Sequence, residues 1–149
     1  MNRPWLFDQQ AIRKSRKNVG IELPTRCEAV RALDDANSIG EADYAEGGHI
    51  LRIVGSSPWR EANRVLWHEL THALQLERDF NGDLEWFVST YWGMMLYLGC
   101  CTADHEWTSK QGDPNYDDWL NLYESHPFEA EAKKNEGYKA RRYPLVVPR

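Results

Sequence analysis

The stretch that decides the fold is residues 57–80, which reads SPWREANRVLWHELTHALQLERDF. Ser57 is a residue type that caps helix N-termini, Pro58 suits the first helical position, and Asn81-Gly82 ends the pattern. At 100° per residue the apolar side chains share one face, formed by Trp59, Ala62, Leu66, Leu70 and Ala73. The stretch therefore predicts an amphipathic helix over residues 58–80 that packs against a core.

This helix contains His68-Glu69-Leu70-Thr71-His72, a sequence of the form H-E-x-x-H. Residues four apart lie one turn apart on the same face, so both imidazoles can reach one metal ion. Glu69 lies about 100° around the helix from His68, where it can take a proton from a water without being a ligand. Zinc suits the pair because it accepts neutral imidazole and lowers the pKa of a bound water. The motif predicts a zinc site on a face away from the core.

A catalytic zinc needs a third protein ligand, which must come from elsewhere in the chain. The metzincin pattern is excluded, because Gln75 and Arg78 stand where that class has a glycine and a third histidine. The remaining candidates are His105, Glu124, His126, Glu129 and Glu131. If a last helix begins at Pro127, Glu129 lies on its packed face, where a buried carboxylate needs a partner, and Glu131 lies about 200° away. We expect Glu129 to be the ligand and Glu131 to be solvated, with Lys133 as the alternative partner of Glu129.

The rest of the pattern predicts a single α+β domain over residues 1–149. The best strand is His49–Val54, which is bounded by glycines. We also expect a basic helix over 8–17, a strand over 19–23, a helix over 84–100, a loop over 103–118, a helix over 127–140 and an extended tail over 143–149. The helix over 84–100 is apolar almost all round, which is typical of a buried element. Residues 27–33 are ambiguous, and residues 34–48 are rich in turn formers.

Composition and charge narrow the class of protein. The 149 residues are 42% hydrophobic and 28% charged, which is typical of a globular domain. The net charge of −5 argues against a dedicated nucleic-acid binder, although residues 1–33 are basic and include the cluster Arg13, Lys14, Arg16 and Lys17. Residues 34–85 are acidic. We therefore regard nucleic acid as an improbable partner.

The three cysteines and the hydropathy pattern bear on location. No Cys-x-x-Cys pair occurs, so a zinc site made of cysteines is not supported. The odd cysteine count is compatible with a reducing compartment. We see neither a signal peptide nor a transmembrane segment, and we expect a cytoplasmic protein with no membrane partner.

A resemblance to a known family follows from two runs, LWHELTHALQ at residues 66–75 and HPFEAEA at residues 126–132. Together they resemble the short gluzincin-type zinc metallopeptidases, the minigluzincin group, and small H-E-x-x-H proteins of bacteria and their phages. The resemblance covers residues 48–140. It implies a zincin-like α+β domain with a small antiparallel or mixed sheet and an active-site helix over 58–80. It also implies that a Glu-x-x-Ala segment on a later helix supplies the third ligand, which corresponds to Glu129 and Ala132.

The same resemblance implies how a substrate binds. An upstream strand lines the cleft and pairs with an extended peptide, which would make His49, Ile50, Leu51, Arg52 and Ile53 substrate-binding residues. One departure concerns Lys133, which stands where related families often carry an acidic residue. The partners of the histidines are therefore unassigned.

The expected activity is zinc-dependent hydrolysis of peptide bonds, as a metalloendopeptidase that acts on a protein or peptide. Zn²⁺ would be held by His68, His72 and Glu129, with Glu69 as the general base for the attacking water. The developing oxyanion needs a further donor. Candidates near the second motif are Tyr123, His126 and Tyr138, and the sequence does not choose among them. Neither the natural substrate nor the oligomeric state follows from the sequence.

Two other classes of function remain. One is a SprT-like, nucleic-acid-associated protease. SprT-like proteases also use H-E-x-x-H with a later histidine, here His105, and the basic residues of 1–33 would then contact the nucleic acid. Such proteins usually add a four-cysteine zinc ribbon, for which three cysteines are insufficient. Alternatively, the chain is a catalytically silent zinc-binding interaction protein with a phage or host partner.

Overall fold

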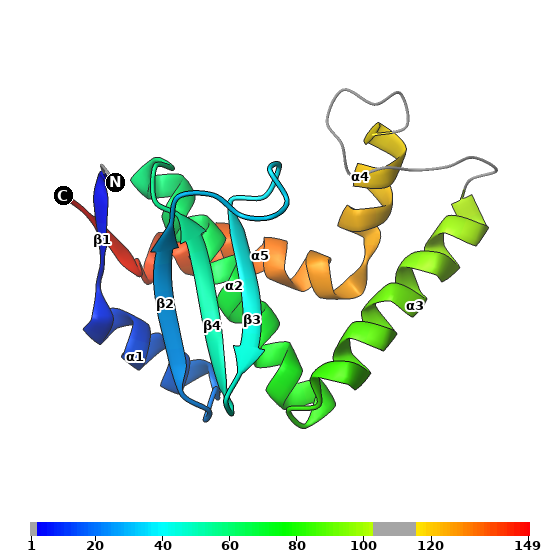
Figure 1. Cartoon of the computed structure of the whole chain (residues 1–149), viewed down its shortest axis with the longest axis horizontal. Helices are drawn as coiled ribbons and strands as arrows, with labels where there is room; N and C mark the ends of the chain where they lie inside the picture. Colours follow the sequence, from blue (N-terminus) through cyan, green and yellow to red (C-terminus); the bar gives the residue numbers. More distant parts are fainter. Residues whose placement is uncertain (1–2, 103–115) are drawn as a thin grey trace.

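The structure is a computed structural model that describes residues 3–102 and 116–149. Within these ranges the chain has an α+β fold with five helices and two small sheets (Figure 1). The α+β class agrees with the sequence prediction, which had four helices and one small sheet. The elements in chain order are β1 (Trp5–Phe7), α1 (Gln9–Val19), β2 (Thr25–Val30), β3 (Gly40–Ala45), β4 (Gly48–Val54), α2 (Trp59–Phe80), α3 (Leu84–Thr102), α4 (Tyr116–Ser125), α5 (Pro127–Arg142) and β5 (Val146–Pro148).

The larger sheet has three strands in the order β2-β4-β3. The predicted strand over 49–54 is confirmed as β4, which pairs in parallel with β2 and antiparallel with β3. The expectation that His49–Ile53 pairs with a substrate is wrong, because both edges of β4 already carry ladder hydrogen bonds. The open edges of this sheet belong to β2 and β3.

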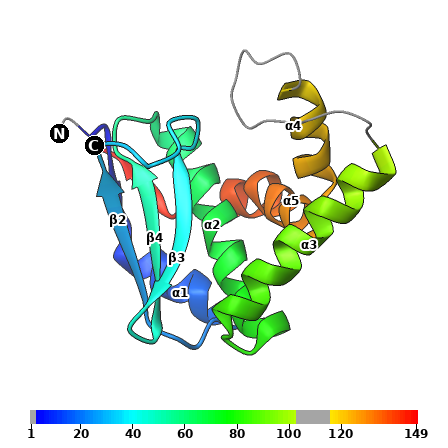
Figure 2. The same cartoon turned by 45° about the vertical axis from the view of Figure 1, so that its right-hand side comes forward.

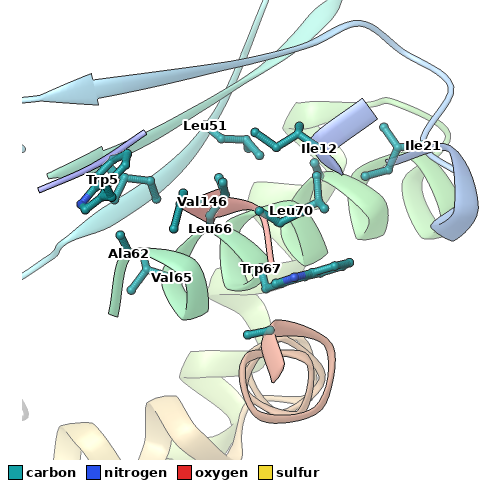
Figure 3. Close-up of a cluster of buried hydrophobic side chains, with 14 residues drawn as sticks. Trp5, Ile12, Ile21, Leu51, Ala62, Val65, Leu66, Trp67, Leu70 and Val146 are labelled. Atoms are coloured by element: carbon teal, nitrogen blue, oxygen red, sulfur yellow. The ribbon is translucent and has the colours of Figure 1, made fainter. Parts of the chain in front are cut away.

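Helix α2 lies directly against this sheet, and the core forms between them. The predicted apolar face is confirmed, since Ala62, Leu66, Leu70 and Ala73 are at most 2% exposed and Trp59 packs against the cluster. Figure 3 shows Leu51 of β4 beside Leu66 and Leu70 of α2. One local prediction is wrong: Pro58 is the N-cap residue, and the Ser57 hydroxyl instead donates to the carbonyl of Val54.

The N-terminal elements differ in part from the prediction. The helix over 8–17 is confirmed as α1, but the strand over 19–23 is wrong, because the helix continues through Val19 and ends at Gly20 with a left-handed φ of 99°. Three strands were not predicted: β1 near the N-terminus, β2 in an ambiguous stretch and β3 in a stretch rich in turn formers. Strand β1 pairs antiparallel with β5 in the extended C-terminal tail, so the two ends of the chain lie side by side (Figure 1).

Helices α3, α4 and α5 stand on the side of α2 away from the sheet (Figure 2). The predicted helix over 127–140 is confirmed as α5, which packs along α2. Helix α4 was not predicted, and it begins inside the predicted loop over 103–118; the rest of that loop lies outside the described residues. None of the described helices combines the length and apolarity that a bilayer span requires.

The prediction that the second long helix is buried is wrong. Helix α3 contacts α2 and α4 mainly through one side, on which Met95 is 1% exposed and Phe87 is partly covered. Its other side carries Trp86, Trp92, Leu96 and Tyr97, which are all more than half exposed. An all-apolar helix is buried only when neighbouring elements surround it, and the elements that the structure describes cover one side of α3.

Candidate metal centre

Three predicted ligands meet between α2 and α5. The Nε2 atom of His68 lies 2.9 Å from Oε2 of Glu129, and Nε2 of His72 lies 2.9 Å from Oε1 of the same carboxylate. The two histidines are one helical turn apart on α2, and Glu129 comes from the first turn of α5. The side chain of Glu129 is 4% exposed. Contact between the helices therefore brings together residues that are far apart in the sequence.

The donor set fits a metal ion. Among the described residues, one potential ligand atom from each of these three side chains lies within 4.8 Å of the others. A tetrahedral zinc ion with bonds of about 2.0–2.2 Å separates its ligand atoms by about 3.4 Å, so small side-chain shifts would admit it. Two imidazoles and one carboxylate are a ligand set that catalytic zinc uses.

The other ring nitrogens of the two histidines also face acceptors. Nδ1 of His72 is hydrogen bonded to Oε1 of Gln75 at 2.9 Å. In a neutral imidazole that donates from Nδ1, the Nε2 atom carries no proton and is free to bind a metal ion. Nδ1 of His68 is buried without a hydrogen-bond partner, and Oε1 of Glu136 lies 3.1 Å away, at an ion-pair distance but outside hydrogen-bond geometry. Gln75 and Glu136 thus take the places that the sequence left unassigned. Lys133 instead pairs with Glu124 at 2.8 Å.

Gln75 also ties the two ligand-bearing helices together. Its side chain is completely buried, and its amide nitrogen donates to the carbonyl of Phe128 and to Oε1 of Glu131, both at 2.9 Å. Arg78 forms an ion pair with the same Glu131 carboxylate at 2.8 Å. Glu131 is therefore not freely solvated as expected: Gln75 and Arg78 hold its carboxylate at the edge of the site, about one-third exposed.

Two tyrosines bind the third ligand. The Tyr91 hydroxyl donates to Oε1 of Glu129 at 3.1 Å, and the Tyr123 hydroxyl also forms a hydrogen bond with Glu129. Burial, together with the charge of Glu129, raises the pKa of both phenols, so they remain protonated donors. Tyr123 was among the predicted oxyanion donors. Tyr91 was missed because it lies in the apolar pattern of α3. Its hydroxyl group was the one feature that could have marked it as a hydrogen-bond donor.

The electrostatics of the triad favour charged side chains when no ion is bound. Burial raises the pKa of Glu129, but hydrogen bonds from His68 and His72 lower it by more, to well below its usual range. Burial lowers the pKa of His68, while Glu129 and Glu136 raise it by more, to about 10. The pKa of His72 is raised in the same way by Glu129. Zinc would replace protons on these rings.

Glu69 borders the triad from the same helix. Its side chain is largely buried, and burial raises the pKa of its carboxyl, against the opposing effect of the two histidines. Strand β3 approaches it closely at Gly40. A Cβ atom there would overlap Val65 and lie 3.2 Å from Oε1 of Glu69, so this position requires glycine. The strand thereby forms a wall of the site beside Glu69.

Two cavities flank the triad. The larger, of about 480 Å³, is lined on its polar side by Asp35, Glu136 and Tyr123. The smaller, of about 220 Å³, is mainly apolar and lies between β3 and α3. Glu69, Tyr91, Trp92 and Glu129 line both cavities. A bound chain could therefore extend on both sides of the triad.

Several predicted residues do not join the site as donors to a substrate. His126 is fully buried as the N-cap of α5; its Nδ1 accepts from the backbone of Phe128 and its Nε2 contacts the carbonyl of Tyr91 at 3.0 Å. Tyr138 is 52% exposed, packs under Arg142 and lines neither cavity. These two predicted oxyanion donors are wrong, because their polar groups are engaged or face solvent. The alternative ligand His105 lies outside the described residues.

The predicted substrate strand is also occupied by the fold. His49 is 2% exposed, and its Nε2 pairs with Oε2 of Glu77 at 2.6 Å. Arg52 forms ion pairs with carboxylates of the neighbouring strands, including Asp43 at 3.1 Å. Ile50, Leu51 and Ile53 are at most 8% exposed. These residues build the sheet and the core.

The centre therefore consists of Glu69, the His68–His72–Glu129 triad and two tyrosines, from α2, α3, α4 and α5. All three triad members and Glu69 were named from the sequence. Comparisons with protein-family models, curated proteins and solved structures give no match to this chain.

Proposed function

We propose that the protein is a zinc-dependent metallopeptidase with a zincin-like site. The observation that carries the proposal is the meeting of both H-E-x-x-H imidazoles with the Glu129 carboxylate, at 2.9 Å each. A histidine pair on one helix is a common motif, but a buried carboxylate aimed at both Nε2 atoms from another helix is far more specific. The hydrogen bonds from Tyr91 and Tyr123 to the Glu129 carboxylate add to this specificity.

His68, His72 and Glu129 would hold the ion, which supplies Lewis acidity and a water of lowered pKa when bound. Glu69 then accepts the proton of the attacking water and delivers it to the leaving amine. A carboxyl whose pKa is raised by burial is a stronger base than an exposed one, which suits this role. Tyr123 lines the larger cavity as a protonated phenol, but its single O–H already donates to Glu129, so it would reach the oxyanion only by giving up that hydrogen bond.

The open edge of β3 is the favoured place for the substrate backbone. Among the described strands, β3 pairs with β4 alone, so its second edge carries unpaired main-chain groups. Gly40 borders the larger cavity and Ala42–Tyr44 border the smaller one. An extended peptide added to this edge would run past the triad with its main chain hydrogen bonded. This favours unfolded or extended protein segments as substrates.

Metal content and hydrolysis together test the proposal. Purified in zinc, the wild type should bind about one ion per chain and cleave an unfolded, carboxymethylated protein, and a chelator should abolish cleavage. Glu129→Ala should weaken zinc binding by at least about tenfold. The matched variant Glu131→Ala should retain zinc, because its carboxylate is held by Gln75 and Arg78.

Three results would contradict the proposal. The first is the absence of any divalent ion after purification in zinc. The second is an equal loss of zinc in both glutamate variants, which would mean that Glu129 has no special role. The third is full zinc occupancy without cleavage of any unfolded protein, which would leave a metal-binding module.

A further inference from the structure

Helix α3 carries a row of exposed apolar side chains at successive helical turns. The row consists of Leu84, Val88, Trp92 and Leu96, whose exposed fractions are 37%, 42%, 53% and 62%. Residues four apart form a continuous ridge along a helix surface. We call this row the α3 ridge. Single exposed apolar residues are ordinary on proteins, but a continuous row of this kind is characteristic of a binding surface.

The α3 ridge is continuous with the proposed active site. Leu84, Val88 and Trp92 line the smaller cavity, and Trp92 also lines the larger one. Across the smaller cavity stand Ala42–Tyr44 of β3, whose outer edge is unpaired among the described strands. Figures 1 and 2 both show α3 on the β3 side of the molecule, with β2 farther away. The ridge and the strand edge therefore face the same space.

The spacing of the ridge matches that of an extended chain. Four residues of an α-helix rise about 6 Å, so the ridge is about 18 Å long. In an extended strand every second side chain points the same way, at intervals of about 6.7 Å, so four such side chains in a segment of about seven residues span about 20 Å, close to the length of the ridge. Successive ridge residues can thus contact alternate side chains of one extended segment.

The chemistry of the helix indicates which side chains these would be. Helix α3 has the sequence LEWFVSTYWGMMLYLGCCT, which contains no lysine or arginine and a single acidic residue, Glu85. Electrostatic attraction therefore contributes little along this helix. Burial of apolar area is the available driving force for binding.

We propose that the α3 ridge binds alternate apolar side chains of an extended polypeptide whose backbone lies along the edge of β3. That the polypeptide is a substrate rests on the proposed function. The substrate class is then unfolded protein segments with large apolar residues at every second position. Folded proteins bury such segments, so they would be spared.

Peptide binding to the zinc-loaded Glu69→Gln protein tests the inference without any need for turnover. Two fluorescent peptides of equal length and charge are compared by anisotropy, one with Leu and Phe at alternate positions and one with Ser and Thr there. The apolar peptide should bind at least about tenfold more tightly. Trp92→Ser and Leu96→Ser should each weaken its binding by about tenfold, and they should change binding of the polar peptide by less than about twofold.

Tyr97→Ser is the matched control for Leu96→Ser, because Tyr97 is 70% exposed on the same helix and, like Leu96, lines neither cavity, but it lies off the ridge. Equal binding of the two peptides would overturn the inference, and so would an equal effect of Tyr97→Ser and Leu96→Ser. A dimer in sedimentation experiments that Leu96→Ser dissociates would also overturn it, because the occupant would then be a second copy. Selective binding without any cleavage by the wild type would contradict only the proposed function.

Discussion

The two longest helices, α2 and α3, differ in burial, and the difference is the opposite of what their compositions suggest. Helix α2 contains many charged and polar residues, yet it is buried on nearly all sides between the sheet and α5. Helix α3 is almost wholly apolar, yet its Trp86, Trp92, Leu96 and Tyr97 side chains are each more than half exposed. Burial is therefore set by the elements that surround a helix, and an apolar helix that is left exposed is available for binding.

The buried helix also carries the polar chemistry. His68, Glu69, Thr71 and Gln75 are each at most 9% exposed, and all lie on the side of α2 that faces α5 or the cavities. Polar groups at such sites need partners, since an unpaired buried group costs about 1–3 kcal/mol. Helix α5 supplies many of these partners, including the carboxylate of Glu129. If a metal binds between the helices, it would strengthen a contact that the fold already requires.

The largest expected difference between the two helices is catalytic. Glu69→Gln should retain zinc and lower peptide hydrolysis by about 10²–10⁴-fold, because an amide accepts no proton from the attacking water. Glu85→Gln makes the same chemical change at an exposed position of α3 and should leave the rate unchanged. Initial rates on one peptide, with zinc content measured in parallel, check both. Equal rates for Glu69→Gln and the wild type would contradict the role of Glu69.

A second difference concerns the packing of leucines. Leu66→Ala on α2 should lower the free energy of unfolding by about 2–5 kcal/mol, because it opens a cavity at a fully buried position. Leu96→Ala on α3 should change it by less than about 0.5 kcal/mol, because its side chain is 62% exposed. Urea unfolding of the two variants measures the difference. Similar losses would mean that the outer side of α3 is covered in solution.

A third difference concerns polar residues. Asn63 of α2 donates to the carbonyl of Ala140 at 2.8 Å and accepts from the backbone of Leu145 at 2.7 Å, so it joins α2 to the C-terminal segment. Asn63→Ala should cost about 1–3 kcal/mol of unfolding free energy, because two buried backbone groups lose their partner. Ser89→Ala, at an exposed position of α3, should cost less than about 0.5 kcal/mol. A neutral Asn63→Ala variant would show that water replaces both hydrogen bonds.

The last expected effect is a dependence of stability on pH. In zinc-free protein the pKa of His68 rises from 6.5 to about 10 on folding, so the charged imidazole stabilises the contact between α2 and α5. This stabilisation is complete below pH 6.5 and is lost as the pH rises toward 10. Zinc binding should strengthen over the same range, because the ion competes with protons. The Tm of chelated protein should therefore fall between pH 6.5 and 10, and a rise would contradict this account.

The elements that were predicted correctly are those with strong local patterns. Helices α2 and α5 and strand β4 have clear periodicity, bounding glycines or a proline at the helix start, and the H-E-x-x-H spacing follows from helix geometry alone. Glu129 was chosen over Glu131 because it shares a helix face with Ala132, and the structure places it against both histidines. In these cases the local sequence and the tertiary fold agree.

The features that were missed depend on contacts between distant segments. Strand β3 lies in a stretch rich in turn formers and owes its conformation to pairing with β4. Pairing of β4 on both sides, which excludes it as a substrate strand, is a property of the whole sheet. The roles of Gln75 and Tyr91 depend on where α5 packs. No local pattern encodes these arrangements.

The pairing of β1 with β5 determines how the molecule would respond to a mechanical load. Trp5 pairs with Pro148, and Phe7 pairs with Val146, so both chain ends leave the ribbon at the same end. A force applied between the ends would load these pairs one after another, starting at Arg149 N–H and the carbonyl of Pro4, instead of all together. The ribbon would peel apart at low force and would next withdraw Trp5, which is fully buried. The sheet and the α2–α5 contact would resist only after those steps.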